Sequence, residues 1–331
     1  TGDAQVFFNT GAYMMNTASF FQKWMKDVLD AQDNKGKIPA IMPFSRGNAM
    51  YNATGTSVGW ADVIYLLPYR YYKMYGDKNI LADNYPAMKK YADFCLKNTG
   101  HKDKKAAKED PYDKYVYEKG FHLGEWLEPA EFVEDISAQS APKLVHTEEC
   151  TAYFHLTMAT MEEIARLLGK TDDAALFHEY AEGSKKAYDN LFLQTVPDTD
   201  RQAKLVRPLA LGCVPDEKID AVANRLFTAV TNRGYRIGTG FLSTPFVLKT
   251  LTENGRADLA YKMLENEGAP SWLAEVNAGA TTVWEDWQGD ASHNHYSPGA
   301  VCEWMFDTIL GINVTGERHF TVKPVPGGTL D

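Results

Sequence analysis

The sequence has little cysteine, with four residues spread over 331 positions and no Cys-x-x-Cys pair. This spacing gives no sign of a zinc site or of the dense disulfide framework of a small secreted scaffold. Cationic residues are also in deficit, because 34 Lys and Arg stand against 44 Asp and Glu, for a formal net charge of −10. Nucleic-acid binding needs clustered cations, and a membrane helix needs roughly 18 consecutive apolar residues, which the sequence lacks. Neither nucleic acid nor a membrane is therefore an expected partner.

Repeats of fixed period are also lacking, whereas helical periodicity is strong. Apolar residues recur at spacings of three and four over 60–74 and over 81–95, with a short polar turn between them. The same plan recurs over 153–168 and 176–191. Strand-like sequence is confined to short pieces, chiefly 319–325. This pattern predicts an all-α protein whose helical hairpins close into a toroid rather than an α-solenoid. Further helices are expected over 7–29, 202–211, 217–231, 242–252, 257–267 and 299–310.

The loop segment 281–287 is the most informative for function. It reads Thr-Thr-Val-Trp-Glu-Asp-Trp, so that Glu285 and Asp286 lie between Trp284 and Trp287. Indole faces pack against the apolar face of a pyranose, and a carboxylate can take a proton from water, so this composition suits sugar chemistry. The structural alternative is that both tryptophans anchor the loop to the core and leave Glu285 exposed.

Other aromatic and imidazole side chains have two interpretations each. Trp60 begins an apolar helical stripe, which favours core packing, whereas Trp126 lies in a loop where contact with a ligand is more plausible. His293 and His295 could bind a metal, but a third ligand at a fitting spacing is missing from the sequence. A histidine that binds hydroxyl groups or orders the loop is the better interpretation, and no metal or other cofactor is expected.

Several short motifs, taken in order, resemble the catalytic domain of the α-L-rhamnosidases, glycoside hydrolase family 78. The resemblance covers nearly the whole chain and implies an (α/α)6 barrel over residues 1–316. It also implies that residues 317–331 are the start of a C-terminal β-sandwich domain that is mostly absent. The matching pieces are Thr-Gly-Asp-Ala-Gln at 1–5, Gly-Trp-Ala-Asp at 59–62, Gly-Glu-Trp-Leu at 124–127, Thr-Gly-Phe-Leu at 239–242, the segment 281–287, and Asn-His-Tyr at 294–296 followed by 299–304.

The resemblance implies hydrolysis of terminal α-L-rhamnosides with inversion and gives roles to individual residues. Glu285 matches the general base that activates the attacking water. Asp3 matches an acidic residue that binds the sugar hydroxyls, and His295 matches a second hydroxyl contact. Trp60 and Trp126 match the aromatic walls of the sugar pocket. Glu125 is also an expected sugar-binding residue and stands where many relatives have aspartate.

One expected residue is missing from the matched pattern. The general acid of the resembled family is a glutamate that precedes the Gly-Asp of positions 2 and 3 by a few residues, so it would lie upstream of Thr1. The chain starts with Thr1 rather than methionine, as expected for an internal cut from a longer protein. Because inverting hydrolysis needs two carboxyl groups, we expect this fragment alone to be impaired on natural glycosides.

Two other functions fit the same residues. The chain could be an inverting (α/α)6 glycosidase for another sugar, because a fold alone does not fix specificity. It could also be a carbohydrate-binding barrel that holds a sugar without cleaving it. In the first interpretation the expected partners are a rhamnose-containing glycoside or polysaccharide and the β-domains of the parent chain.

Overall fold

The computed structural model describes residues 1–44, 57–132, 146–316 and 319–329. Helices dominate the described residues, and a two-stranded antiparallel sheet lies near the C-terminus. The helices and strands are α1 (Gly2–Met14), α2 (Ala18–Ala31), α4 (Val63–Tyr75), α5 (Asn79–Lys97), α6 (Lys104–Glu109), α7 (Thr147–Leu167), α8 (Thr171–Leu191), α9 (Gln202–Ala210), α10 (Ile219–Asn232), α11 (Val247–Glu253), α12 (Ala257–Leu264), α13 (Trp272–Asn277), α14 (Val301–Trp304), β1 (Ile312–Gly316) and β2 (His319–Val322).

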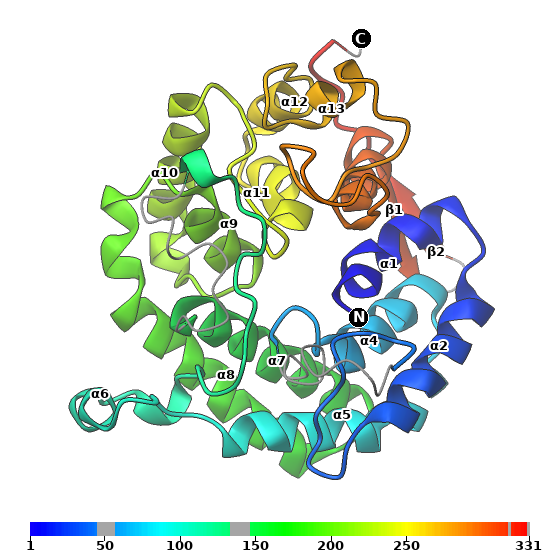
Figure 1. Cartoon of the computed structure of the whole chain (residues 1–331). Coiled ribbons are helices and arrows are strands. Elements are labelled where there is room, and N and C mark those ends of the chain that lie inside the picture. Colours follow the sequence, from blue (N-terminus) through cyan, green and yellow to red (C-terminus); the bar gives the residue numbers. More distant parts are fainter. Residues whose placement is uncertain (45–56, 133–145, 317–318, 330–331) are drawn as a thin grey trace.

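The helices form a closed toroid, as the hairpin pattern predicts (Figure 1). An inner layer is closed by contacts that run in sequence order from α1 through α4, α7, α9, α11 and α14 and return to α1. The outer layer pairs each of several inner helices with its successor in the chain, as in α4 with α5, α7 with α8, α9 with α10 and α11 with α12. The structure therefore confirms the all-α class and the barrel of helical hairpins.

Burial follows the two layers. The inner helix α4 is buried at six consecutive residues, from Val63 to Pro68, because it packs between the outer helices and its inner neighbours. The outer helix α10 buries only one stripe, at Val222, Ala223, Leu226, Ala229 and Val230. This amphipathic spacing leaves the opposite face of α10 to solvent.

Several element boundaries differ from the sequence-based prediction. The single helix expected over 7–29 is two helices, because the chain is extended at Met15 between α1 and α2. The helix expected over 242–252 begins as α11 only at Val247, after a 3-10 turn that contains Pro245, since proline disfavours a helical conformation in the residue before it. Near the C-terminus, α14 ends at Trp304 and a π-helical segment, Met305–Ile309, follows it.

Only one strand of the C-terminal pair was predicted from the sequence. The prediction of strand-like sequence over 319–325 corresponds to β2, but its partner β1 was missed. The expected domain boundary at 316/317 falls between these two paired strands and stays a prediction, and residues 317–318 and 330–331 lie outside the described part of the chain. Among the described residues, no helix is both long and apolar enough to cross a bilayer.

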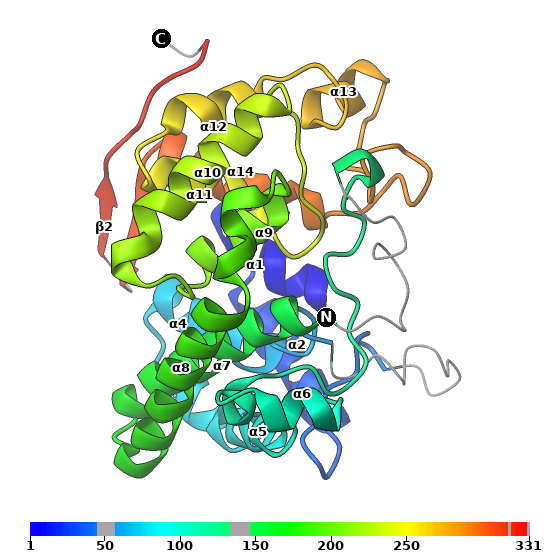
Figure 2. The same ribbon diagram turned by 90° about the vertical axis from the view of Figure 1, so that its left-hand side faces the viewer.

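The loops that carried the functional motifs gather at one end of the toroid. In the side view, the N-terminus and the loops after α6 and α13 lie on the same side of the molecule (Figure 2). The inner helices α1, α4, α11 and α14 begin next to segments of this rim, so the helical ring supports the irregular segments. Functional residues are commonly carried on loops held by such a scaffold.

Candidate active site

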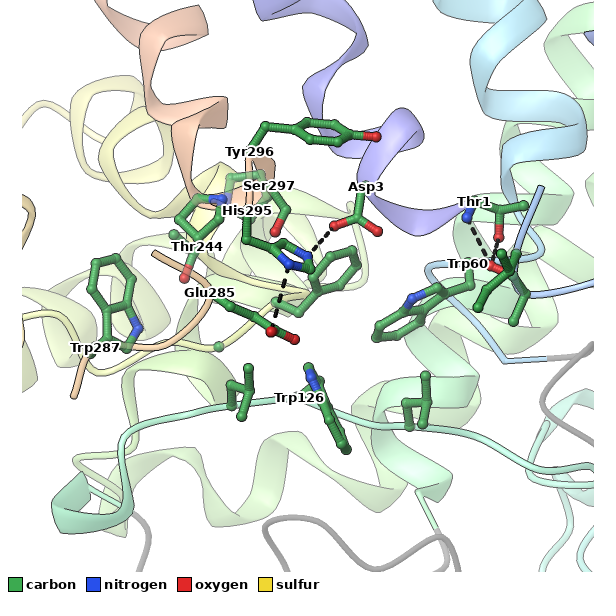
Figure 3. A pocket seen from close by; sticks show the side chains of 18 of the residues that line it. Thr1, Asp3, Trp60, Trp126, Thr244, Glu285, Trp287, His295, Tyr296 and Ser297 are labelled. Carbon is green, nitrogen blue, oxygen red and sulfur yellow. Dashed lines mark hydrogen bonds and ion pairs between the residues drawn. The ribbon is translucent and has the colours of Figure 1, made fainter. Parts of the chain in front are cut away.

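A cavity of about 430 Å³ lies at this end of the toroid. It is lined by the start of α1, by the turn before α4, by the loop 123–127, by the segment 240–245, and by the loop between α13 and α14. Five of the six residues expected at the site line this cavity, namely Asp3, Trp60, Trp126, Glu285 and His295 (Figure 3). The sixth, Glu125, does not line it.

Glu285 is held by a short antiparallel pairing within its loop. Its backbone N–H donates to the carbonyl of Ser292 at 2.8 Å, and the Ser292 N–H donates to the Glu285 carboxylate at 3.2 Å. The N–H of His295 donates to the carbonyl of Val283 at 2.8 Å. These bonds fix the backbone on both sides of Glu285 and direct its carboxylate into the cavity, with 24% of the side chain exposed (Figure 3).

His295 lies between the two carboxylates of the cavity. Its Nε2 is 2.7 Å from Oδ1 of Asp3, and its Nδ1 is 3.6 Å from Oε2 of Glu285. The hydrogen bond to Asp3 raises the pKa of His295; burial opposes this effect, and the charges of Asp3 and Glu285 add to it. The pKa of Asp3 is shifted in the opposite direction. Burial would raise its pKa, but the hydrogen bond and charge of His295, together with smaller effects of the N-terminal amine and a backbone hydrogen bond, outweigh burial and lower the pKa below its usual value.

Two indoles face these polar groups from other elements. Trp60, carried by the turn before α4, stacks on Phe241 with ring centroids 4.3 Å apart and planes 17° from parallel. The carbonyl of Trp126 accepts a 2.8 Å hydrogen bond from the N–H of Phe241, which ties the two loops together. Trp60 thus lines the cavity although only 7% of it is exposed, so it packs in the core and borders the cavity at the same time.

Glu125 points away from the cavity, which corrects its expected placement against the sugar. Its carboxylate accepts hydrogen bonds from the N–H groups of Gly240 and Ser243, at 2.9 and 2.8 Å, and from the Ser243 hydroxyl at 2.8 Å. The buried guanidinium of Arg207 donates to it at 3.1 Å. With these partners, Glu125 holds the segment that carries Phe241 and leaves no free oxygen for a ligand.

The two tryptophans beside Glu285 have different positions. Trp287 lines the cavity, and its indole N–H donates to the carbonyl of Thr239 at 3.1 Å, so it anchors the loop as the structural alternative expects. Trp284 is not part of the lining and stacks on His293 with ring centroids 4.6 Å apart. The structural alternative also left Glu285 exposed, but only 24% of its side chain is exposed, and it faces the cavity.

Some lining residues were not expected from the sequence. Phe241, Thr244, Pro245 and Tyr296 all contribute to the cavity. Phe241 and Tyr296 lie within motifs that carry the family resemblance, which was the one available signal, but neither received a role. Within the described residues, no group of three or more His, Cys, Asp or Glu side chains is placed to hold a metal ion.

Comparisons with known proteins agree with this geometry. Residues 1–309 match the family model described as a bacterial α-L-rhamnosidase six-hairpin glycosidase domain. An α-L-rhamnosidase of Streptomyces avermitilis is 32% identical over the whole chain, and one of Formosa agariphila is 30% identical over the whole chain. The chain spans 30% and 35% of these proteins, about a third of their length.

Solved structures of α-L-rhamnosidases also match this chain over its whole length. The crystal structure of the Streptomyces avermitilis α-L-rhamnosidase complexed with L-rhamnose matches with a TM-score of 0.84 and 30% identity, over 100% of this chain and 30% of that one. The native α-L-rhamnosidase of Aspergillus terreus matches with a TM-score of 0.85 and 26% identity, over 100% of this chain and 38% of that one.

Proposed function

Since this chain belongs to the family of bacterial α-L-rhamnosidase six-hairpin glycosidase domains, we propose that it is the catalytic barrel of a glycoside hydrolase that removes terminal α-L-rhamnose from rhamnosides with inversion. One observation carries the proposal: the carboxylate of Glu285 enters the cavity beside the Asp3–His295 pair and faces Trp60 and Trp126 (Figure 3). A base, hydroxyl-binding groups and flat apolar surfaces are the three components that hydrolysis of a pyranoside needs at one place.

The proposed chemistry begins at Glu285. Its carboxylate takes a proton from a water molecule, whose oxygen then bonds to the anomeric carbon of the sugar. The glycosidic C–O bond breaks on the opposite face of the ring, and the leaving oxygen takes a proton from a general acid. Attack and departure on opposite faces invert the anomeric configuration, and the two carboxyl groups of such a pair lie about 6.5–9.5 Å apart.

Asp3 is a poor candidate for the general acid. A proton donor needs a carboxyl group whose pKa is raised, so that it stays protonated near neutral pH. The hydrogen bond and charge of His295 lower the pKa of Asp3 instead. We therefore assign Asp3 and His295 to the binding of sugar hydroxyls, and we place the general acid N-terminal to Thr1, where the family resemblance puts it.

The decisive experiment compares Glu285→Gln with the unchanged protein in a form that includes the sequence preceding Thr1. We expect the variant to lose at least about 10²-fold in kcat on an aryl α-L-rhamnoside, because a general base contributes about 10²–10⁴-fold. Binding of L-rhamnose, measured by calorimetry, should persist because the pocket is intact. Asp290→Asn is the matched control, since this exposed carboxylate lies in the same loop.

The outcomes separate the competing functions. Cleavage of aryl α-L-rhamnosides in preference to other aryl glycosides supports the proposal, and cleavage of another sugar instead identifies a glycosidase of different specificity. Binding of rhamnose with no cleavage of any glycoside by the extended protein would identify a carbohydrate-binding barrel. Near-full activity of Glu285→Gln would overturn the assignment of the base.

A further inference from the structure

A second carboxylate lies directly behind the loop that carries Glu285. Glu275 belongs to α13, a short helix capped by Ser271, whose hydroxyl accepts the N–H of Ala274 at 3.1 Å. Only 5% of Glu275 is exposed. Oε2 of its carboxylate accepts the backbone N–H of Trp284 at 3.3 Å. Glu275 therefore contacts the residue that immediately precedes the proposed base, although it does not line the cavity itself.

The other oxygen of Glu275 is buried without a hydrogen-bond partner among the described residues. No Lys, Arg or His side chain among the described residues forms an ion pair with Glu275. A buried carboxylate without compensation is costly, and an unpaired buried anion costs far more than an unpaired neutral hydroxyl group. The site of Glu275 thus favours the neutral carboxylic acid over the carboxylate.

The neighbouring charges act in the same direction. Burial raises the pKa of Glu275 to about 7; the Trp284 N–H opposes this effect, and the negative charge of Asp286 adds to it. Asp286 is itself buried, and its carboxylate accepts the N–H groups of Gly289 and Asp290 at 2.8 and 3.0 Å. The other titratable groups on this loop are Glu285, Asp290, His293, His295 and Tyr296. Of these, His293 stacks on Trp284, and His295 lies 3.6 Å from Glu285.

The amides of Trp284 and Glu285 are consecutive, and each has one acceptor. The Trp284 amide is held by the side chain of Glu275, whereas the Glu285 amide is held by the carbonyl of Ser292 within the loop. The bond from Glu275 therefore ties the backbone at the base to the helix behind it. Ionisation of Glu275 would place a buried anion beside Asp286, and the two negative charges would repel each other. This repulsion is relieved when the loop that carries Glu285 moves away from α13 and admits water.

We propose that Glu275 is a positioning residue that holds Glu285 at the cavity through the Trp284 peptide and makes this alignment depend on pH. The inference rests on the proposed role of Glu285. Neutral Glu275 keeps the loop against α13, and ionised Glu275 releases it. A fall in activity on the alkaline side then arises from misplacement of the base, in addition to any loss of a proton from the general acid.

The test measures kcat and KM against pH for an aryl α-L-rhamnoside, in the N-terminally extended protein. We expect kcat of the unchanged protein to fall about tenfold between pH 6 and 8, as one group with a pKa near 7 ionises. Glu275→Gln is neutral at every pH and keeps an acceptor oxygen. The Glu275→Gln variant should retain most of the activity at pH 6, and its kcat should decrease much less between pH 6 and pH 8 than that of the unchanged protein. Glu267→Gln, an exposed position nearby, is the matched control.

An activity-independent measurement completes the test. Hydrogen exchange of the peptide 280–288, corrected for intrinsic rates and compared with α7, should lose protection about tenfold between pH 6 and 8 in the unchanged protein and not in Glu275→Gln. Unchanged protection in the wild-type protein overturns the inference even if no variant folds, and an alkaline fall that Glu275→Gln fully retains also overturns it. Loss of protection without rhamnosidase activity would support the positioning of the loop and refute only the proposed function.

Discussion

His295 and Asp3 form a hydrogen-bonded ion pair across 2.7 Å, although 292 positions separate them in the sequence. Asp3 lies at the start of α1, and His295 lies in the loop before α14, and these two helices are neighbours in the inner layer of the toroid. Closure of the ring is therefore what builds the site. The first helix of the barrel and the loop that leads into the last helix each contribute a polar group, and neither segment could form the pair alone.

We expect Asp3→Asn to lower the free energy of unfolding more at pH 6 than at pH 9. Because Asp3 raises the pKa of His295, the pair stabilises the fold fully below the ordinary histidine pKa of about 6.5. This contribution is lost as the pH rises through the raised value. Both side chains are partly exposed, so the effect at pH 6 should be about 1 kcal/mol.

Urea unfolding at the two pH values measures this difference. Glu162→Gln provides a control, because Glu162 forms a carboxylate–histidine pair at 3.1 Å with His178, whose side chain is 53% exposed. A destabilisation by Asp3→Asn that grows between pH 6 and pH 9 would contradict the assignment of the raised pKa to His295.

The placement of the general acid makes a prediction about leaving groups. The 331-residue chain by itself should be slower than its N-terminally extended form by about 10²–10⁴-fold on alkyl rhamnosides, the usual contribution of a general acid. Aryl rhamnosides with acidic phenols need little protonation of the leaving oxygen and should suffer less. A series of phenols of decreasing pKa measures this slope, with circular dichroism to verify that both forms are folded. Equal losses across the series would refute the explanation.

Much of the fold could be predicted from the sequence because the hairpins carry local signals. The stripes over 60–74 and 81–95 correspond to α4 and α5, and Gly76, with φ of 72°, ends α4 where the polar turn was expected. The break between α1 and α2 was missed, because the apolar pattern continues across it. The strand β1 was missed as well, since its pairing with β2 is a tertiary feature.

The site was predicted less evenly. Composition identified the loop of Glu285, and the family resemblance identified Asp3, Trp60, Trp126 and His295 as residues that meet at one cavity. Glu125 was misplaced because adjacent loop residues point in different directions: Trp126 faces the cavity, whereas Glu125 faces Arg207. Phe241 and Glu275 were missed because their contacts, with Trp60 and with the Trp284 amide, depend on tertiary packing that no local pattern shows.

Phe241 supports the indole of Trp60, and its removal should weaken sugar binding. A stacked aromatic pair contributes about 0.5–1.5 kcal/mol beyond buried area, so Phe241→Ala should weaken the binding of L-rhamnose by about two- to tenfold. Calorimetry measures the dissociation constant. Phe20→Ala is the control, because Phe20 is 62% exposed on α2 and does not line the cavity. Unchanged affinity in Phe241→Ala would show that Trp60 keeps its orientation without the stack.

The buried pair of Glu125 and Arg207 should be essential for stability although it does not touch the cavity. Glu125→Ala removes the acceptor of two backbone N–H groups and leaves the buried guanidinium without one of its carboxylates, Glu148 being another at 3.1 Å. Breaking one side of a buried ion pair costs about 3–5 kcal/mol, so unfolding in urea should show a loss of this size. Glu131→Ala, which removes an exposed partner of Arg236, should change stability by less than about 1 kcal/mol. A loss that small in Glu125→Ala would mean that the segment around Phe241 is held by other contacts, and that Glu125 is free to take another role.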